Sequence, residues 1–142
     1  MSKPDDFPWL APYLAVEDVE RSMAFYGAAF GFTFRSQARN DEGNVVHGEM
    51  NYQDCVILMG TVNAYEDNTQ TPKYSQRPSP IVLYVYVDDV DQFYEAALTQ
   101  GAESVMPVQE MPWGDRTCHL KDLDDYIWAF ATNIKPCPNA NQ

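Results

Sequence analysis

Two short stretches of this chain have the same pattern, Val16-Glu17-Asp18-Val19-Glu20 and Val87-Asp88-Asp89-Val90-Asp91, and together they indicate its fold. Each follows an extended apolar segment and opens a helical pattern. An aspartate stands at the expected helix N-cap of each, at position 18 and again at position 89. The following acidic residue is favoured by the helix dipole. The chain is therefore predicted to consist of two similar halves.

The first half predicts a strand followed by a helix and three more strands. Leu10 to Val16 is extended and apolar, and Gly31 is placed to end the helix. Three- and four-residue spacing predicts a buried helical stripe of Val19, Met23, Tyr26 and Phe30. Further extended segments cover residues 32–37, 45–52 and 55–59, with turns at 40–43 and 53–54.

The second half repeats this order. Ile81 to Val87 is rich in β-branched and aromatic residues, which favour a strand. The helix should end at Gly101, and its predicted buried face comprises Val90, Phe93, Tyr94, Ala97 and Leu98. Extended segments follow at residues 103–108, 116–120 and 126–132.

These halves predict an α+β fold in which two β-α-β-β-β modules in tandem form curved mixed sheets around a cavity. Half of this chain would be marginally stable alone, so we expect one domain over residues 1–142. Module one covers about 9–60 and module two about 81–134, and a polar tail occupies 135–142. The linker at 61–80 is rich in Asn, Thr, Pro and Ser and lacks periodicity, so we expect an irregular connection or a loop over the site.

Composition narrows the possible partners. Nine Lys and Arg against 21 Asp and Glu give a formal charge of −12, which repels phosphate backbones and disfavours nucleic acid. Such a charge favours a cationic ligand or serves only solubility. No apolar run approaches the roughly 18–20 residues that cross a bilayer. The acidic N-terminus does not resemble a signal peptide, so we expect a cytoplasmic protein without a membrane partner.

The three cysteines are widely spaced and odd in number. Cys55, Cys118 and Cys137 form no Cys-x-x-Cys pair, so a disulfide framework or zinc site is not expected. We predict small buried thiols, with Cys137 in the polar tail as the candidate for exposure.

Several motifs in order resemble the vicinal oxygen chelate superfamily, which includes glyoxalase I and the bleomycin resistance proteins. The resemblance covers roughly residues 9–134, and its later motifs are similar to a PhnB-like branch. The motifs are Pro12 to Asp18, Phe25-Tyr26, Ala29 to Phe32, His47-Gly48-Glu49-Met50, Trp113-Gly114-Asp115-Arg116, and Asp122 with Trp128. The last turn departs from the branch, with Leu123, Asp125 and Tyr126 in place of proline, glycine and histidine.

The resemblance also implies where a divalent metal would bind in enzymes of this superfamily. Those ligand positions fall on Ala11, Glu49, Val82 and Ala129, of which only Glu49 can ligate a metal. We therefore predict no metal and no cofactor. An alternative site would combine His47 and Glu49, two apart on one strand face, with His119, if His119 faces the cavity.

Strand alternation predicts the lining of the cavity. The candidate ligand-binding residues are Tyr13, His47, Glu49, Asn51, Tyr84 and Tyr86, with Trp113 and Arg116 at the mouth. Ala11 and Ala129 would leave room for a ligand. Glu49 is the candidate catalytic residue, since a partly apolar cavity would raise its pKa and suit a general base. Alternatively, the tyrosines fill the interior or a dimer interface.

Three functions follow from these observations. The leading hypothesis is a metal-independent small-molecule binding protein that sequesters an aromatic or cationic compound. The second is a lyase, isomerase or dioxygenase-like enzyme that uses Glu49 with a divalent metal. The third is a scaffold with a vestigial cavity. The resemblance further implies a homodimer.

Overall fold

The computed structural model describes residues 2–138 and contains two helical and strand-rich halves. In chain order the elements are β1 (Tyr13–Val16), α1 (Val19–Phe30), β2 (Thr33–Arg39), β3 (Val45–Tyr52), β4 (Cys55–Thr61), α2 (Pro72–Ser75), β5 (Leu83–Tyr86), α3 (Val90–Thr99), β6 (Glu103–Glu110), β7 (Asp115–Lys121) and β8 (Ile127–Asn133).

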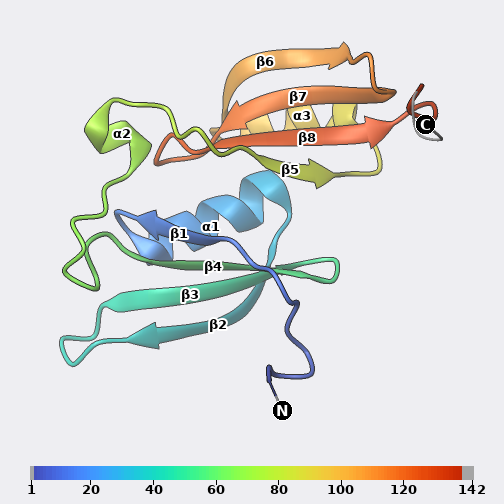
Figure 1. The fold of residues 1–142 in the computed structure, drawn as a ribbon. Helices are drawn as coiled ribbons and strands as arrows, with labels where there is room; N and C mark the ends of the chain where they lie inside the picture. The colour runs from blue at the N-terminus through green and yellow to red at the C-terminus, as the bar shows by residue number, and fades with distance from the viewer. Residues whose placement is uncertain (1, 139–142) are drawn as a thin grey trace.

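The strands form two mixed sheets with the same topology. Their orders are β1-β4-β3-β2 and β5-β8-β7-β6, so β1 and β5 are edge strands that face each other across a seam (Figure 1). In each sheet the first strand is parallel to the last: Tyr13 lies opposite Leu58, and Tyr84 lies opposite Ala129. The predicted α+β fold of two tandem β-α-β-β-β modules is confirmed.

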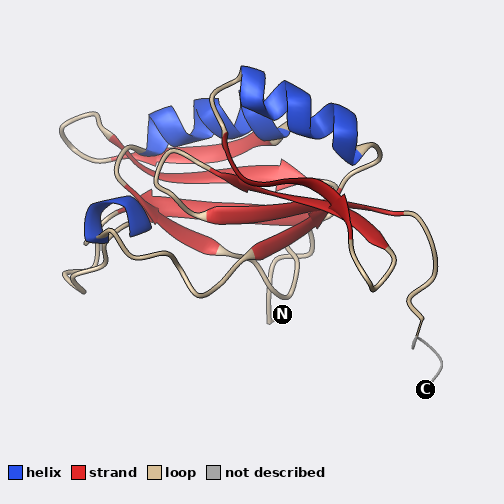
Figure 2. Cartoon of the chain, turned by 90° about the horizontal axis from the view of Figure 1, so that it is seen from above, coloured by secondary structure: helices blue, strands red, loops and turns tan. Residues whose placement is uncertain are grey.

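Both long helices cover the same side of the two sheets (Figure 2). The Asp18 side chain accepts a hydrogen bond from the Arg21 amide, and Asp89 does the same for Gln92. Gly31, with φ of 74°, ends α1 in the left-handed conformation that favours glycine. Both predicted N-caps are therefore present. The opposite side of the sheets, which we call the open face, carries the linker and the N-terminal residues.

An aromatic core joins the two modules. Tyr26 and Phe30 of α1 pack against Trp128 and Phe130 of β8, with 4.7 Å between the ring centroids of Phe30 and Phe130. All four side chains are buried. The predicted stripe on α1 is confirmed, whereas only Val90 and Ala97 of the predicted face of α3 are fully buried. Since one core spans both halves, the modules stabilise each other.

Several sequence expectations need correction. The linker contains the short helix α2, and Thr71 is its N-cap. The backbone amide of Lys73 in this helix donates a hydrogen bond to the Asp124 carbonyl. Cys118 is buried as predicted, but Cys55 is exposed, because it starts β4 at a hairpin turn. Residues 139–142 of the polar tail lie outside the described residues.

Within residues 2–138, no helix has the length and apolar character needed to span a membrane.

Candidate functional site

The predicted cavity residues of module one surround a carboxylate that already has an arginine and a histidine as partners. Glu49 on β3 accepts a hydrogen bond from Arg35 Nε at 3.1 Å and lies 2.9 Å from His47 Nε2. Arg35 also pairs with Asp6 at 3.0 Å and packs over the Phe7 ring. The charge of Glu49 is therefore paired with that of Arg35, and the N-terminal residues Asp6 and Phe7 contact this arginine.

This network changes the chemistry that was expected of Glu49. The hydrogen bond with His47, reinforced by Arg35, outweighs burial and lowers the pKa of Glu49. The prediction of a raised pKa for Glu49 is therefore wrong. Strand alternation places His47 on the same face as Glu49 but does not reveal Arg35. A β-bulge between Phe34 and Ser36 brings Arg35 beside Glu49. A carboxylate with a lowered pKa is a weaker general base.

Tyr13 also lies on the open face of module one. Its ring crosses β4 above Gly60, where an added Cβ would overlap the phenol, and its hydroxyl lies 3.3 Å from that of Tyr65 in the linker. Burial and the hydrogen bond with Tyr65 raise the pKa of Tyr13 to about 12, so the phenol stays protonated at neutral pH. Asn51 follows Glu49 on the same face of β3.

Module two carries a cluster that we call the tyrosine platform, made of Tyr84, Tyr86, Trp113 and Asp115. Both tyrosine hydroxyls donate to Asp115 Oδ2 at 2.7 Å, and Trp113 Nε1 donates to the Tyr84 hydroxyl at 3.1 Å. The two tyrosine ring centroids are 5.6 Å apart in an edge-to-face arrangement. All three aromatic side chains are exposed, whereas Asp115 is buried.

Asp115 was not among the predicted site residues. Burial opposes its ionisation, but hydrogen bonds from Asn133, Tyr84 and Tyr86 outweigh burial and hold the pKa of Asp115 below its usual range. The hydrogen bond to Asp115 in turn raises the pKa of Tyr86 to about 12. The sequence signal was the Trp113-Gly114-Asp115-Arg116 motif, whose aspartate follows a turn glycine at the start of a strand.

Arg116 does not lie at the mouth of a cavity. Its Nε and Nη2 atoms each donate to the Asp91 carboxylate of α3 at 2.8 Å. Because Asp115 and Thr117 face the open side of β7, the intervening Arg116 faces the helices.

The principal pocket lies at the seam between the modules and has a volume of about 630 Å³. We call it the seam pocket, and most of its lining is apolar. It is lined by Leu10, Ala11, Pro12, Phe32, Tyr52, Gln53, Asp54, Cys55, Ile57, Leu83, Tyr84, Val85, Tyr86 and Trp128. The Tyr52 hydroxyl donates to the Tyr86 carbonyl at 2.6 Å and bridges the two modules beside the pocket.

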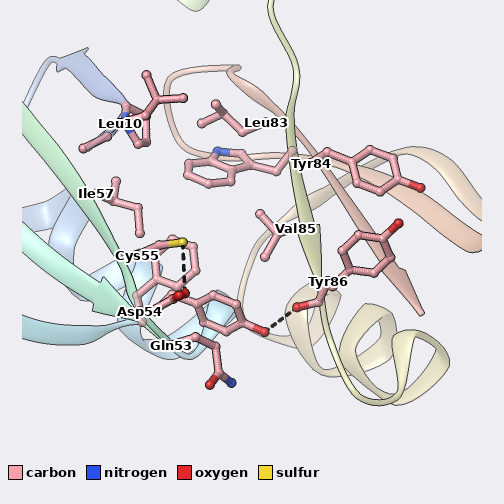
Figure 3. A pocket seen from close by; sticks show the side chains of 14 residues that line it. Leu10, Gln53, Asp54, Cys55, Ile57, Leu83, Tyr84, Val85 and Tyr86 are labelled. Atoms are coloured by element: carbon pink, nitrogen blue, oxygen red, sulfur yellow. Dashed lines mark hydrogen bonds between the residues drawn. The ribbon is translucent and has the colours of Figure 1, made fainter. Parts of the chain in front are cut away.

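Figure 3 shows which face of β5 borders this pocket. Leu83 and Val85 point toward Leu10 and Ile57, whereas the rings of Tyr84 and Tyr86 point away. We expected the rings of Tyr84 and Tyr86 to line one cavity together with Glu49. The seam pocket is not that cavity, because it borders the face of β5 that carries Leu83 and Val85. The predicted residues form two separate groups, one in each module.

The side chains do not fit the metal centre that the superfamily resemblance implied. In module two, Ala129 of β8 lies beside Tyr84 of β5. In module one, the residue beside Tyr13 of β1 is Leu58 of β4, and Glu49 lies on β3, one strand further from the seam. His119 lies beside Ala129 and shares its face, but in module two. Among residues 2–138, no three His, Cys, Asp or Glu side chains gather closely enough to hold an ion.

The fold and these two sites define a two-module protein with an apolar pocket between its modules. A family model described as the Glyoxalase/Bleomycin resistance protein/Dioxygenase superfamily matches residues 7–130. The chain belongs to this superfamily.

A sequence relative and two solved structures are similar to this chain. An uncharacterized protein of Mycobacterium bovis is 24% identical over 130 residues, which cover 90% of this chain and 85% of the relative. TioX from Micromonospora sp. ML1 is similar in structure, with a TM-score of 0.68, 23% identity, and coverage of 88% of this chain and 98% of TioX. TnmS3, an antibiotic binding protein from Streptomyces sp. CB03234, has a TM-score of 0.64 and 17% identity, with 87% and 93% of the two chains covered.

Proposed function

We propose that this protein is a metal-independent small-molecule binding protein that sequesters an aromatic or cationic compound. The seam pocket carries the proposal. Its volume of about 630 Å³ lies within the range of small-molecule sites, roughly 300–1,000 Å³. Trp128 and Phe32 supply buried aromatic surface, and the few polar groups are at Tyr52, Gln53 and Asp54. This lining favours a flat apolar ligand.

The superfamily supports the same proposal. TnmS3 is described as an antibiotic binding protein and shares the fold. A sequestering protein needs affinity without turnover, which suits a pocket with hydrophobic walls and few reactive groups. Burial and the neighbouring Asp54 raise the pKa of Cys55, the thiol at the pocket, and this disfavours a nucleophilic role.

Cysteine alkylation tests occupancy of the seam pocket. Cys55 lines it, and the exposed Cys137 lies outside it as an internal reference. Nile red, a neutral aromatic dye, should bind saturably with increased fluorescence and slow alkylation of Cys55 but not of Cys137. Equal alkylation of both thiols with and without saturating dye would contradict binding at this pocket.

A filled-pocket variant provides the matched test. Leu83→Trp should occupy the pocket and weaken dye binding at least about tenfold, equivalent to about 1.4 kcal/mol. Val105→Trp, an exposed position on β6, is the control and should bind like the parent protein. If both variants bind equally well, the dye lies elsewhere.

The second candidate function is a lyase, isomerase or dioxygenase-like enzyme that uses Glu49 with a divalent metal. The 2.9 Å contact between His47 and Glu49 on the open face favours it, and the pairing of Glu49 with Arg35 opposes it. Elemental mass spectrometry of protein purified without chelator or tag distinguishes the two. About one equivalent of metal, lost in Glu49→Gln, would favour the enzyme.

We further propose a cytoplasmic homodimer of the PhnB-like branch, without nucleic-acid or membrane partners. The charge of −12 argues against phosphate-rich partners.

The dimer is supported by exposed apolar residues beside the first strands of the two modules. Trp9, Leu10 and Ile81 are exposed by 70–89%, and apolar residues at these positions suit an interface. Light scattering during size-exclusion chromatography should give twice the 16.2 kDa chain mass. A monomer mass at micromolar concentration would contradict the dimer.

A further inference from the structure

The tyrosine platform is built by side chains that reach across a strand. Tyr84 and Tyr86 start on β5, and their hydroxyls reach Asp115 on β7. Strand β8 lies between them and carries Ala129 and Ala131 beside the two tyrosines. Both alanines are completely buried, although the long helices α1 and α3 lie on the other side of the sheets. The tyrosine rings therefore lie over the alanines, and their other sides remain open to solvent.

The platform sits above a carboxylate that lacks a cationic partner. In the described chain, the side chains that donate hydrogen bonds to the Asp115 carboxylate are neutral, namely Tyr84, Tyr86 and Asn133. Among the described residues, no Lys, Arg or His lies within ion-pair distance of this carboxylate. Glu49 is the contrasting case, since Arg35 and His47 both contact it. The open face of module two therefore keeps an unbalanced negative charge beneath exposed aromatic rings.

The same contacts select the kind of cation. Both oxygens of Asp115 are engaged by hydrogen bonds and the residue is 2% exposed, so a metal ion would have to break them to coordinate. The accessible surface consists of aromatic side chains, which attract diffuse organic cations through their ring faces. A quaternary ammonium ion needs no hydrogen-bond acceptor and has low hydration, so it suits this surface.

We infer that the tyrosine platform binds the alkylammonium group of an organic cation, with Tyr84, Tyr86 and Trp113 contacting the cation and Asp115 supplying the balancing charge. This site is distinct from the seam pocket, because the tyrosine rings point away from that pocket (Figure 3). The inference does not require that the seam pocket be occupied.

Titration with choline and with 3,3-dimethylbutan-1-ol, its uncharged isostere, tests the inference. The readout is the indole N–H resonance of Trp113 in NMR, assigned by its loss in Trp113→Leu. Choline should shift this resonance saturably, and the uncharged alcohol should bind about three- to tenfold more weakly. Raising the salt concentration should weaken choline binding further. Equal responses to both compounds, or none to choline, would overturn the inference.

Two pairs of variants locate the binding energy, with choline binding measured by calorimetry. Asp115→Asn removes the unbalanced charge and should weaken binding about three- to tenfold. Asp91→Asn removes a carboxylate that is already paired with Arg116 and should leave binding unchanged. Trp113→Leu changes an exposed residue and should also weaken binding, whereas Trp9→Leu, on the other module, should not.

The variants separate this inference from the proposed function. If Asp115→Asn fails to fold, as judged by circular dichroism, the Trp113→Leu and Trp9→Leu pair still decides. Choline binding that is insensitive to Trp113→Leu would overturn the inference. Nile red binding should be unaffected by Trp113→Leu and should respond to Leu83→Trp, so either site can fail while the other stands.

Discussion

At the residue scale, carboxylates of the same chemistry acquire different roles from their neighbours. Glu49 is paired with Arg35 and lies within hydrogen-bond distance of His47, whereas Asp115 accepts hydrogen bonds from neutral donors only. Asp122 serves the core, since it accepts hydrogen bonds from Tyr26 at 2.5 Å and from Trp128 at 2.9 Å. The neighbours therefore decide which carboxylate stabilises the core and which one is left without a cationic partner.

Replacing Asp122 should be among the most destabilising single changes. Asp122→Ala removes the acceptor of Trp128 Nε1 and of the backbone amides of Asp124 and Tyr126 inside the protein. We expect the free energy of unfolding in urea to fall by about 2–4 kcal/mol. Asp91→Ala, which breaks an exposed pair with Arg116, should cost about 0–1 kcal/mol. Equal losses would show that the Asp122 network does not stabilise the fold.

Asp124 should make stability depend on pH. Burial, with repulsion from Asp122, raises the pKa of Asp124 from 3.8 to about 6. Between these values the folded protein holds the proton more tightly than the unfolded chain, so this contribution to stability is present at low pH and is lost as pH rises through about 6.

Asp124→Asn should remove this dependence. The amide stays neutral, so the free energy of unfolding should rise by about 1–2 kcal/mol at pH 7.5 and change little at pH 4. Urea denaturation at both pH values measures the difference. A variant that is less stable than the parent at pH 7.5 would contradict the raised pKa.

At the element scale, the turn between β6 and β7 positions the platform. Gly114 has φ of 101°, and an added Cβ would overlap the Lys135 carbonyl oxygen. The Gly114 carbonyl accepts hydrogen bonds from the amides of Ile134 and Lys135. This turn places Trp113 beside Tyr84 and Asp115 at the start of β7.

Gly114→Ala should therefore disturb both stability and the platform. We expect a loss of about 2–4 kcal/mol in the free energy of unfolding, from the left-handed backbone and the steric overlap. Gly43→Ala is the control, since Gly43 has φ of 86° but nothing within 4 Å of an added Cβ; its cost should be about 1 kcal/mol. Similar losses in both would contradict the importance of packing against Lys135.

At the scale of the whole molecule, the acidic surface opposes folding through self-repulsion. A formal charge of −12 and a pI near 4.3 leave the protein strongly anionic at neutral pH. Salt screens such repulsion, so raising NaCl from about 0.02 to 0.3 M at pH 7.5 should raise Tm by a few degrees. The gain should vanish near pH 4.5. A decrease of Tm with salt at pH 7.5 would show that attractive ion pairs dominate.

The overall architecture follows from local signals in the sequence. Helix caps at Asp18 and Asp89 and the apolar spacing that follows are local signals, and each half contains them in the same order. The extended segment predicted at 45–52 has the same bounds as the observed β3, because turn residues flank it on both sides. The observed strands β1 and β5 are shorter than predicted. The apolar sequence pattern extends beyond the residues that pair with a neighbouring strand.

The chemistry of the two sites depends on contacts that the sequence pattern does not reveal. The tertiary structure paired Glu49 with Arg35 through a β-bulge, turned Arg116 toward Asp91, and brought Asp115 beneath two tyrosines from another strand. Sequence periodicity gives the face on which a side chain lies, but not which strand or charge stands next to it. Charge balance and pocket position depend on contacts between distant residues, and the fold alone sets those contacts.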